Sequence, residues 1–244
     1  MVPTINSAAS RRATARACYA TAILATALAS CGIDTIEYFP LKTTVSQTSG
    51  SAMTFSGPES DDSNYLGLAI FYKIYASEAK AITDQSYVNS KQSAINTVPG
   101  AIVESTLISA GGLGYQRLIL TTPATGSSAS AAIPTIAKAY LTSDYFVSIS
   151  FPAGSEPRLT VTNEASGAVS EFLIRRSVAG STGAYLTFLD EPASGNSDYV
   201  SSATSALEGT YFVQFFAAAY GLNPNTLTDL YGDAVFLNRI TINL

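Results

Sequence analysis

The sequence offers few residue types that could carry catalytic chemistry. Its 244 residues include no histidine and no tryptophan, so Ser-His-Asp or Cys-His catalysis and metal binding through imidazole are excluded. Ser77 and Lys80 have the Ser-x-x-Lys spacing, which places a lysine one helical turn from a serine nucleophile. Because no Ser-Asp-Asn or Lys-Thr-Gly motif accompanies them, we interpret Ser77 as a helix cap and Lys80 as a surface lysine.

Carboxylates are the remaining candidates for chemistry. They cluster as Asp61-Asp62, Asp190-Glu191, and Asp229 with Asp233. No cluster has the spacing of a calcium loop, and acids in loops rich in Ser, Gly and Asn are typical of solvated turns. Phosphate-binding loops and the Gly-x-Ser-x-Gly elbow are also missing from the sequence. We therefore predict no catalytic residue, no metal and no cofactor, and keep a carboxylate-dependent glycan hydrolase as an alternative.

The N-terminal region has the layout of an export signal. Arg11, Arg12 and Arg16 form a basic stretch, and residues 17–30 after it are uncharged and rich in Ala, Leu and Ile. This apolar stretch of about 14 residues is shorter than the roughly 20 that a helix needs to cross a bilayer. The pattern indicates a secretory signal rather than a membrane span.

The end of this segment, Leu28-Ala29-Ser30-Cys31-Gly32, resembles the lipobox of bacterial lipoproteins. The resemblance implies a signal peptidase that recognises Leu28, Ala29 and Ser30 and cuts before Cys31. It also implies that the Cys31 thiol carries the lipid that attaches the protein to a membrane. An ordinary secretory signal followed by a chance cysteine remains the alternative.

Processing at this site would change the charge and cysteine count of the chain. It removes Cys18, so Cys31 becomes the sole cysteine and no intrachain disulfide can form. It also removes three arginines, which takes the net charge from −5 to −8. Such an acidic chain argues against nucleic acid as a partner. We expect an exported protein anchored through Cys31 at the outer membrane or the periplasmic face of the envelope, with an unidentified protein or glycan partner.

The elements that would position any site are mainly strands. Residues 65–75 are rich in β-branched and aromatic residues, which predicts a central strand buried on both faces. A helix is predicted near residues 78–96, with Ile82, Val88 and Ile95 on its apolar side. Further strands are predicted at 33–39, 102–108, 115–121, 133–139, 145–151, 158–162, 171–175, 184–189, 211–220 and 234–242. Strands separated by turn residues predict a mainly β fold, an antiparallel β-sandwich with one inserted helix.

Two further resemblances support this architecture. Residues 211–217 (YFVQFFA), followed by Gly221 and the strand at 234–242, resemble the last strands of fibronectin type III modules. The resemblance implies an immunoglobulin or fibronectin III-like sandwich, although the usual early tryptophan is absent and no binding residue carries over. The lipobox, residues 67–75 and residues 215–221 together resemble predicted lipoproteins of spirochaetes, which implies an envelope location.

These observations predict three parts: a cleaved signal peptide (1–30), a linker with the first strands (31–64), and a β-sandwich domain (65–244), whose division near 123–143 stays open. We interpret most aromatic residues as core, with Tyr185, Tyr199 and Tyr231 as candidates for a recognition rim. The predicted function is a non-enzymatic, membrane-anchored lipoprotein that acts as a binding or interaction module. Besides the hydrolase, a structural subunit of an envelope assembly is the remaining alternative.

Overall fold

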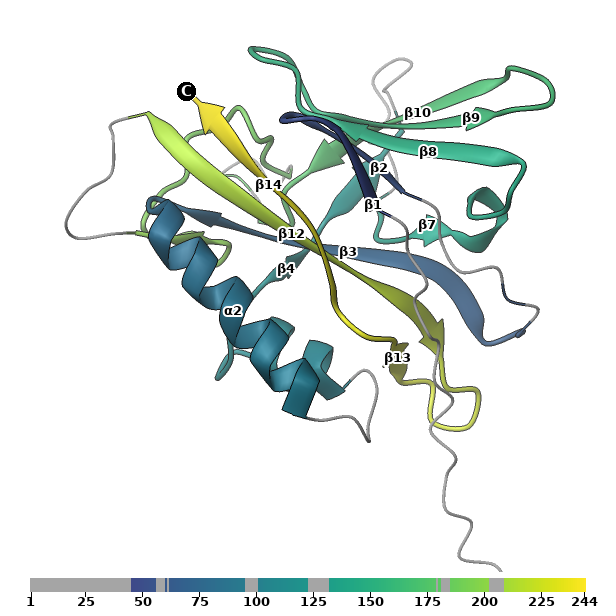
Figure 1. The fold of residues 1–244 in the computed structure, drawn as a ribbon, viewed down its shortest axis with the longest axis horizontal. Coiled ribbons are helices and arrows are strands. Elements are labelled where there is room, and N and C mark those ends of the chain that lie inside the picture. The colour runs from purple at the N-terminus through teal and green to yellow at the C-terminus, as the bar shows by residue number, and fades with distance from the viewer. Residues whose placement is uncertain are drawn as a thin grey trace, which may run out of the picture. The chain divides into compact units, whose positions relative to one another are not determined.

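Two long, apolar strands lie at the centre of the fold (Figure 1). They are β3, Tyr65–Tyr75, and β12, Thr210–Leu222, which pair antiparallel along most of their length. The computed structural model describes residues 45–55, 60, 62–94, 101–122, 132–178, 180, 185–201 and 209–244. Both strands are buried along most of their length, as the run of aromatic and β-branched residues at 65–75 predicts.

The first sheet is built around this pair. Its strand order is β11-β3-β12-β13, with β14 also paired to β12, and β4 and β7 also paired to β3. The added strands are β4 (Gln116–Arg117), β7 (Ile136–Ala137), β11 (Tyr199–Val200), β13 (Asp229–Tyr231) and β14 (Val235–Asn243). The short strand β11 runs parallel to β3, whereas β4, β7, β12, β13 and β14 pair antiparallel.

The second sheet is antiparallel throughout its described strands, in the order β1-β2-β8-β9-β10-β5-β6. Its strands are β1 (Val45–Ser49), β2 (Ala52–Phe55), β5 (Ile119–Thr121), β6 (Ala132–Ile133), β8 (Tyr145–Ser150), β9 (Arg158–Asn163) and β10 (Val169–Arg175). Leu159 and Val161 of β9 are buried, while the residues between and beside them are not. This alternation gives the sheet one apolar face.

The apolar faces of the two sheets pack together and form the main core. Tyr72 of β3 and Phe215 of β12 belong to the same buried cluster as Ile149, Leu159 and Ile174 of the second sheet. The structure therefore confirms the predicted mainly β fold, an antiparallel sandwich with one long helix among the described residues. None of the described helices has the length and apolarity needed to cross a membrane.

Helices cover the other face of the first sheet. They are α2 (Glu78–Ala94) and the π-helical turn η1 (Val103–Ile108), while a short 3₁₀ helix, η2 (Lys138–Tyr140), follows β7. Ala81 and Val88 of α2 and Leu107 of η1 pack with Phe216 in a second buried cluster. The predicted helix near 78–96 is confirmed over residues 78–94, and its last residues, with Ile95, lie outside the described part of the chain. Ile82 does not face the sheet: its side chain is 48% exposed.

Residues 102–108 are helical, so the strand predicted there is wrong. β-Branched residues are common in this segment, but Ile102, Val103, Thr106 and Leu107 are the buried ones. This spacing follows the period of a helix, and the alternation of a strand would have buried different positions. A Cβ at Gly112 would lie 2.3 Å from the Thr106 carbonyl oxygen, so the turn that closes this helix requires glycine.

Other segments differ from their predictions. The single strand predicted at 133–139 is divided: residues 132–133 form β6, residues 136–137 form β7, and η2 begins at Lys138. In the segment 184–189, predicted to be a strand, Tyr185 forms an isolated bridge and the chain then turns. The first predicted strand, at 33–39, lies outside the described residues.

Candidate ligand-binding cavity

The residues predicted for lipidation lie outside the part of the chain that the structure describes. They are Cys31 and the peptidase recognition residues Leu28, Ala29 and Ser30. The lipid anchor therefore stays a prediction from the sequence.

Ser77 and Lys80 both make hydrogen bonds or ion pairs with residues of α2. The carbonyl oxygen of Ser77 accepts a hydrogen bond from Ala81 N at 3.3 Å, which starts α2. The Lys80 ammonium lies 2.5 Å from Asp84 Oδ1, one turn further along the helix, and the Lys80 side chain is 49% exposed. Lys80 is thus engaged with a carboxylate within its own helix.

The acidic clusters hold turns and neighbouring tyrosines. Asp190 Oδ2 accepts a bond from the backbone of Thr187, and Glu191 Oε1 accepts one from the Tyr211 hydroxyl. The two carboxylate oxygens of Asp229 accept bonds from two tyrosine hydroxyls, each at 2.9 Å. Among the described residues, no group of three or more Asp, Glu, His or Cys side chains could hold a metal ion.

The three tyrosines that were candidates for a recognition rim differ in burial and in their contacts. Tyr231 is buried beneath the guanidinium of Arg117, whose Nη2 donates to its hydroxyl at 2.8 Å. Tyr199 is half-buried and packs on Tyr211, with ring centroids 6.0 Å apart. Tyr185 is 40% exposed. Because Tyr231 is part of the core, the three do not form one recognition rim.

A cavity of about 200 Å³ opens where four segments of the sandwich meet. These segments are the β1–β2 turn, the turn after β8, the loop at 188–189 and the end of β14. Its lining is Ser51, Phe151, Pro152, Ala153, Gly154, Ser155, Pro157, Phe188, Leu189, Thr241, Ile242 and Asn243. None of these side chains is ionisable. Apolar walls with a few polar groups are typical of ligand sites.

The buried aromatic wall of this cavity consists of Phe151 and Phe188. Their rings meet edge to face with centroids 5.4 Å apart, and Phe188 also packs on Tyr72 at 5.1 Å. Phe188 is 2% exposed although it lies in a turn outside the strands. A turn residue so fully buried needs a firm attachment for its loop.

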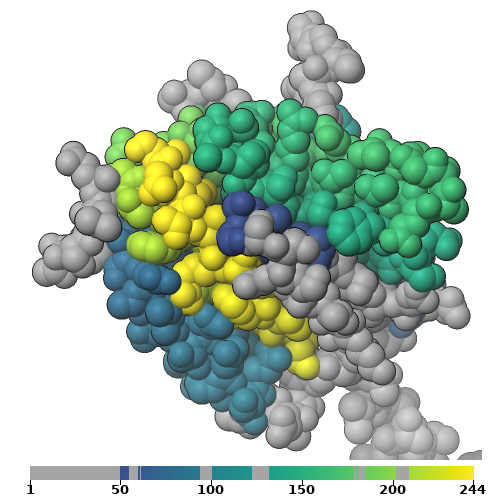
Figure 2. Space-filling view, turned by 45° about the horizontal axis from the view of Figure 1, so that its top comes forward, coloured from purple at the N-terminus to yellow at the C-terminus, as the bar shows by residue number. Residues whose placement is uncertain are grey.

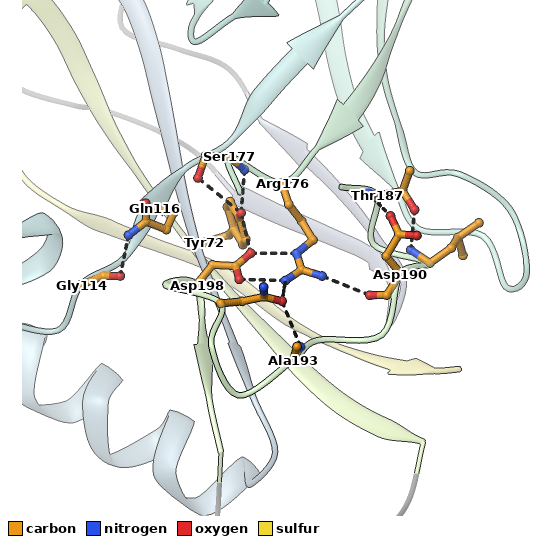
Figure 3. Close-up of polar contacts among 11 residues, drawn as sticks. Tyr72, Gly114, Gln116, Arg176, Ser177, Thr187, Asp190, Ala193 and Asp198 are labelled. Carbon is orange, nitrogen blue, oxygen red and sulfur yellow. Dashed lines mark hydrogen bonds and ion pairs between the residues drawn. The ribbon is translucent and has the colours of Figure 1, made fainter. Parts of the chain in front are cut away.

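A fully buried ion pair supplies this attachment (Figure 3). The Arg176 guanidinium donates from Nε to Asp198 Oδ2 and from Nη2 to Asp198 Oδ1, both at 2.8 Å, and both side chains are 0% exposed. Nη1 also donates to the carbonyl of Asp190 at 3.1 Å, and Nη2 to Asn196 Oδ1 at 2.8 Å. One guanidinium thereby holds three points of the loop that follows Phe188.

Tyr72 connects this network to the central strand. Its hydroxyl donates to Asp198 Oδ2 at 2.8 Å and accepts from the backbone of Ser177 at 2.8 Å. Burial, and then the charge of Asp198, raise the pKa of Tyr72 far above that of a free tyrosine. The backbone carbonyl of Asp198 accepts a bond from Ile74 N at 2.8 Å. The groups in this network satisfy one another, which a buried ion pair requires.

A second buried network fixes α2 to the first sheet. The Tyr75 hydroxyl donates to Asp84 Oδ2 at 3.0 Å, and the Tyr75 and Tyr115 hydroxyl oxygens lie 2.9 Å apart. Gln214 Nε2 donates to Tyr115 Oη at 2.7 Å. Burial raises the pKa of both tyrosines. This network lies beneath the helix, and none of its members lines the cavity.

Another cavity, of about 230 Å³, lies at the opposite edge of the second sheet. It is lined by Leu120, Ile133, Thr135, Ile136, Ala137, Tyr140, Leu159 and Phe172. Tyr140 and Phe172 pack together with centroids 6.2 Å apart. It offers an apolar enclosure with few polar groups to orient a ligand, so the cavity at the end of β14 is the stronger candidate site.

Sequence reasoning missed Arg176 and Asp198. One signal was available. Side chains alternate between the two faces of a strand, so Arg176, two residues after the buried Ile174, points to the same side as Ile174 if the pattern of β10 continues past its end. A charged residue on a core-facing position indicates a buried partner. No protein-family model, curated protein or solved structure matches this chain.

Proposed function

We propose that this protein is a non-enzymatic, membrane-anchored lipoprotein of the cell envelope whose β-sandwich binds a ligand in the cavity at the end of β14. The observation that carries the binding role is the cavity itself. None of the described residues that line it has an ionisable side chain, and a buried ion pair fixes the loop that carries its aromatic wall. Such a site offers shape, apolar contact and hydrogen bonds, which are the means of recognition.

The use of the buried ionisable groups supports binding over catalysis. Arg176 and Asp198 bind each other, and Asp84 is bound by Lys80 and by the Tyr75 hydroxyl. Groups held in this way fix the arrangement of the fold, because each is already engaged with another group of the protein. A general acid or base must instead reach the reacting atoms.

The anchor is tested by two matched cysteine variants of the full chain. Cys31→Ala should abolish metabolic labelling with a fatty-acid analogue and release the protein from the membrane fraction. Cys18→Ala should keep both labelling and membrane attachment, because Cys18 lies in the segment that processing removes. Labelling that survives in Cys31→Ala would refute the lipoprotein proposal.

The binding role is tested by a photo-reactive residue placed in the cavity. We expect p-benzoylphenylalanine at position 153 to form adducts in intact cells, because Ala153 lines the cavity. The same residue at Ala165, in the exposed turn between β9 and β10, is the control. Equal labelling from both positions would contradict a site at the cavity. Hydrolysis by the purified chain that a single change such as Glu191→Gln abolishes would contradict a non-enzymatic role.

A further inference from the structure

On the outer edge of β14, near the cavity, lie main-chain groups that have no hydrogen-bond partner among the described residues. Leu244 N donates to the carbonyl of Gly209 at 2.8 Å, so the backbone of Leu244 points toward β12. Hydrogen-bonded and non-bonded positions alternate in an antiparallel pair. The amide and carbonyl of Ile242 therefore point inward, and those of Thr241 and Asn243 point away from the sheet.

The pairing of β12 with β3 leads independently to the same result. Ile74 N donates to the carbonyl of Asp198 on the far side of β3, so the backbone of Tyr75 points toward β12. Phe212 lies opposite Tyr75 on one side and opposite Thr241 on the other. Because its amide and carbonyl bond to β3, they are not available to Thr241.

In the described part of the chain, the outer edge of β14 is closed at one outward-pointing position and unpaired at the next two. The outward amide of Arg239 is capped by Asn238 Oδ1 at 2.8 Å, a bond that blocks strand pairing there. No described residue accepts a hydrogen bond from the amides of Thr241 and Asn243. Both residues are exposed and line the cavity. Figure 2 shows β14, in yellow, at the surface between α2 and the strands of the second sheet.

We propose that the ligand of this cavity is an extended polypeptide segment that adds as a strand to the edge of β14. Its main chain pairs with Thr241 and Asn243, and one apolar side chain enters the cavity against Phe151 and Phe188. In strand addition, main-chain hydrogen bonds give affinity and a side-chain pocket gives specificity. A charged side chain is disfavoured because the described lining residues offer it no opposite charge. The inference rests on the proposed binding function of this cavity.

The test uses the purified full chain and capped pentapeptides of the form Thr-Val-X-Val-Thr, where X is varied through the standard residues. Binding is measured by fluorescence anisotropy or calorimetry. We expect Leu, Ile, Met or Phe at X to bind, and Glu, Asp or Lys to bind at least about tenfold more weakly. A peptide N-methylated at the amides that face β14 should lose binding, because it keeps its side chains but not its donors.

Two variants at one position separate the main-chain contact from the side chain. Thr241→Pro removes an outward amide that makes no ladder bond, a substitution that edge strands accept. It should abolish peptide binding, whereas Thr241→Val keeps the amide and should retain binding. The far-ultraviolet circular dichroism of each variant checks its fold. If Thr241→Pro unfolds, the comparison of methylated and unmethylated peptides on the unmodified chain still decides.

Three results would each overturn the inference. They are no binding by any peptide up to about 1 mM, equal binding by Thr241→Pro and Thr241→Val, and equal affinity for Glu and Leu at X. Binding measurements with a panel of neutral oligosaccharides distinguish a failure of the peptide proposal from a failure of the proposed binding function. Sugar binding that Ala153→Trp blocks would leave the cavity as a binding site but refute a peptide ligand. The absence of peptide binding, sugar binding and adducts at position 153 would refute both.

Discussion

Replacing Asp198 by asparagine should destabilise the fold strongly, because it removes one charge of a fully buried ion pair. In the native protein, Asp198 accepts two hydrogen bonds from Arg176 and one from the Tyr72 hydroxyl, all at 2.8 Å. Asparagine has nearly the same shape, but its amide group would present hydrogens to the donors of Arg176. Asp198→Asn therefore leaves a buried guanidinium charge without a counter-ion.

The expected loss follows from the complete burial of both partners. Removing one partner of a buried pair costs about 3–5 kcal/mol of unfolding free energy. For a domain of this size each kcal/mol corresponds to about 2–4 °C, so Tm should fall by about 6–20 °C. Phe188 should lose order together with the loop held by Arg176, and its contact with Tyr72 should weaken.

The neighbouring arginine provides a matched control. Arg175 pairs with Glu156, with nitrogen and oxygen 2.5 Å apart, but the two side chains are 16% and 36% exposed. Glu156→Gln makes the same chemical change at a hydrated pair, so it should cost at most about 1 kcal/mol. A double variant, Arg176→Met with Asp198→Leu, removes both charges and should recover most of the stability.

Urea unfolding followed by circular dichroism measures all of these variants. The chain has no tryptophan, so tyrosine fluorescence is the second probe for two-state behaviour. If Asp198→Asn loses no more stability than Glu156→Gln, the buried pair does not behave as an isolated low-dielectric ion pair. That result would show that the Arg176–Asp198 pair does not fix the loop and the cavity wall.

Three further predictions concern other parts of the fold. Burial raises the pKa of Tyr65 and Tyr115, so these groups stay protonated in the native state while the unfolded chain ionises near pH 10. The stability they confer is present below that pH and should fall above it by about 1.4 kcal/mol per pH unit for each tyrosine; a free energy of urea unfolding that stays constant from about pH 10 to about pH 11 would contradict this. Gly67→Ala should cost about 3 kcal/mol or more by calorimetry, because φ is +150° and a Cβ would lie 2.0 Å from a β7 carbonyl; Gly195→Ala, with nothing within 4 Å of its Cβ, should cost little. Arg239→Met should speed hydrogen exchange in α2, because Arg239 bonds Glu78 and Gln85 of that helix as well as Gln214 of β12; unchanged exchange in α2 would contradict it.

The predictions that the structure confirms rest on local patterns. The runs at 65–75, 211–220 and 234–242 are rich in aromatic and β-branched residues, and they form β3, β12 and β14. The helix at 78–94 begins directly after Ser77, the residue predicted to cap it. The strand prediction at 102–108 is wrong because the β-branched residues of this segment favour a strand locally, while the buried positions follow a helical period.

The cavity could not be predicted because its parts are far apart in the sequence. Ser51, Phe151, Phe188 and Thr241 come from four segments that meet only when both sheets have formed. Sheet order depends on long-range pairing, which periodicity does not encode. Similarly, the alternation of β10 indicates that Arg176 points inward, but nothing near it in the sequence points to Asp198 as its partner.

The position of the buried ion pair explains why a loop can form one wall of a binding site. Apolar contacts are non-directional, so they hold a loop against the core without fixing its path. The planar guanidinium of Arg176 donates in fixed directions to Asp190, Asn196 and Asp198, and these bonds define the path as a strand ladder would. Burying the pair costs desolvation, so its contribution is to geometry more than to net stability. The apolar double variant separates the two contributions: it should retain stability but lose the fixed position of Phe188, and with it peptide binding at the edge of β14.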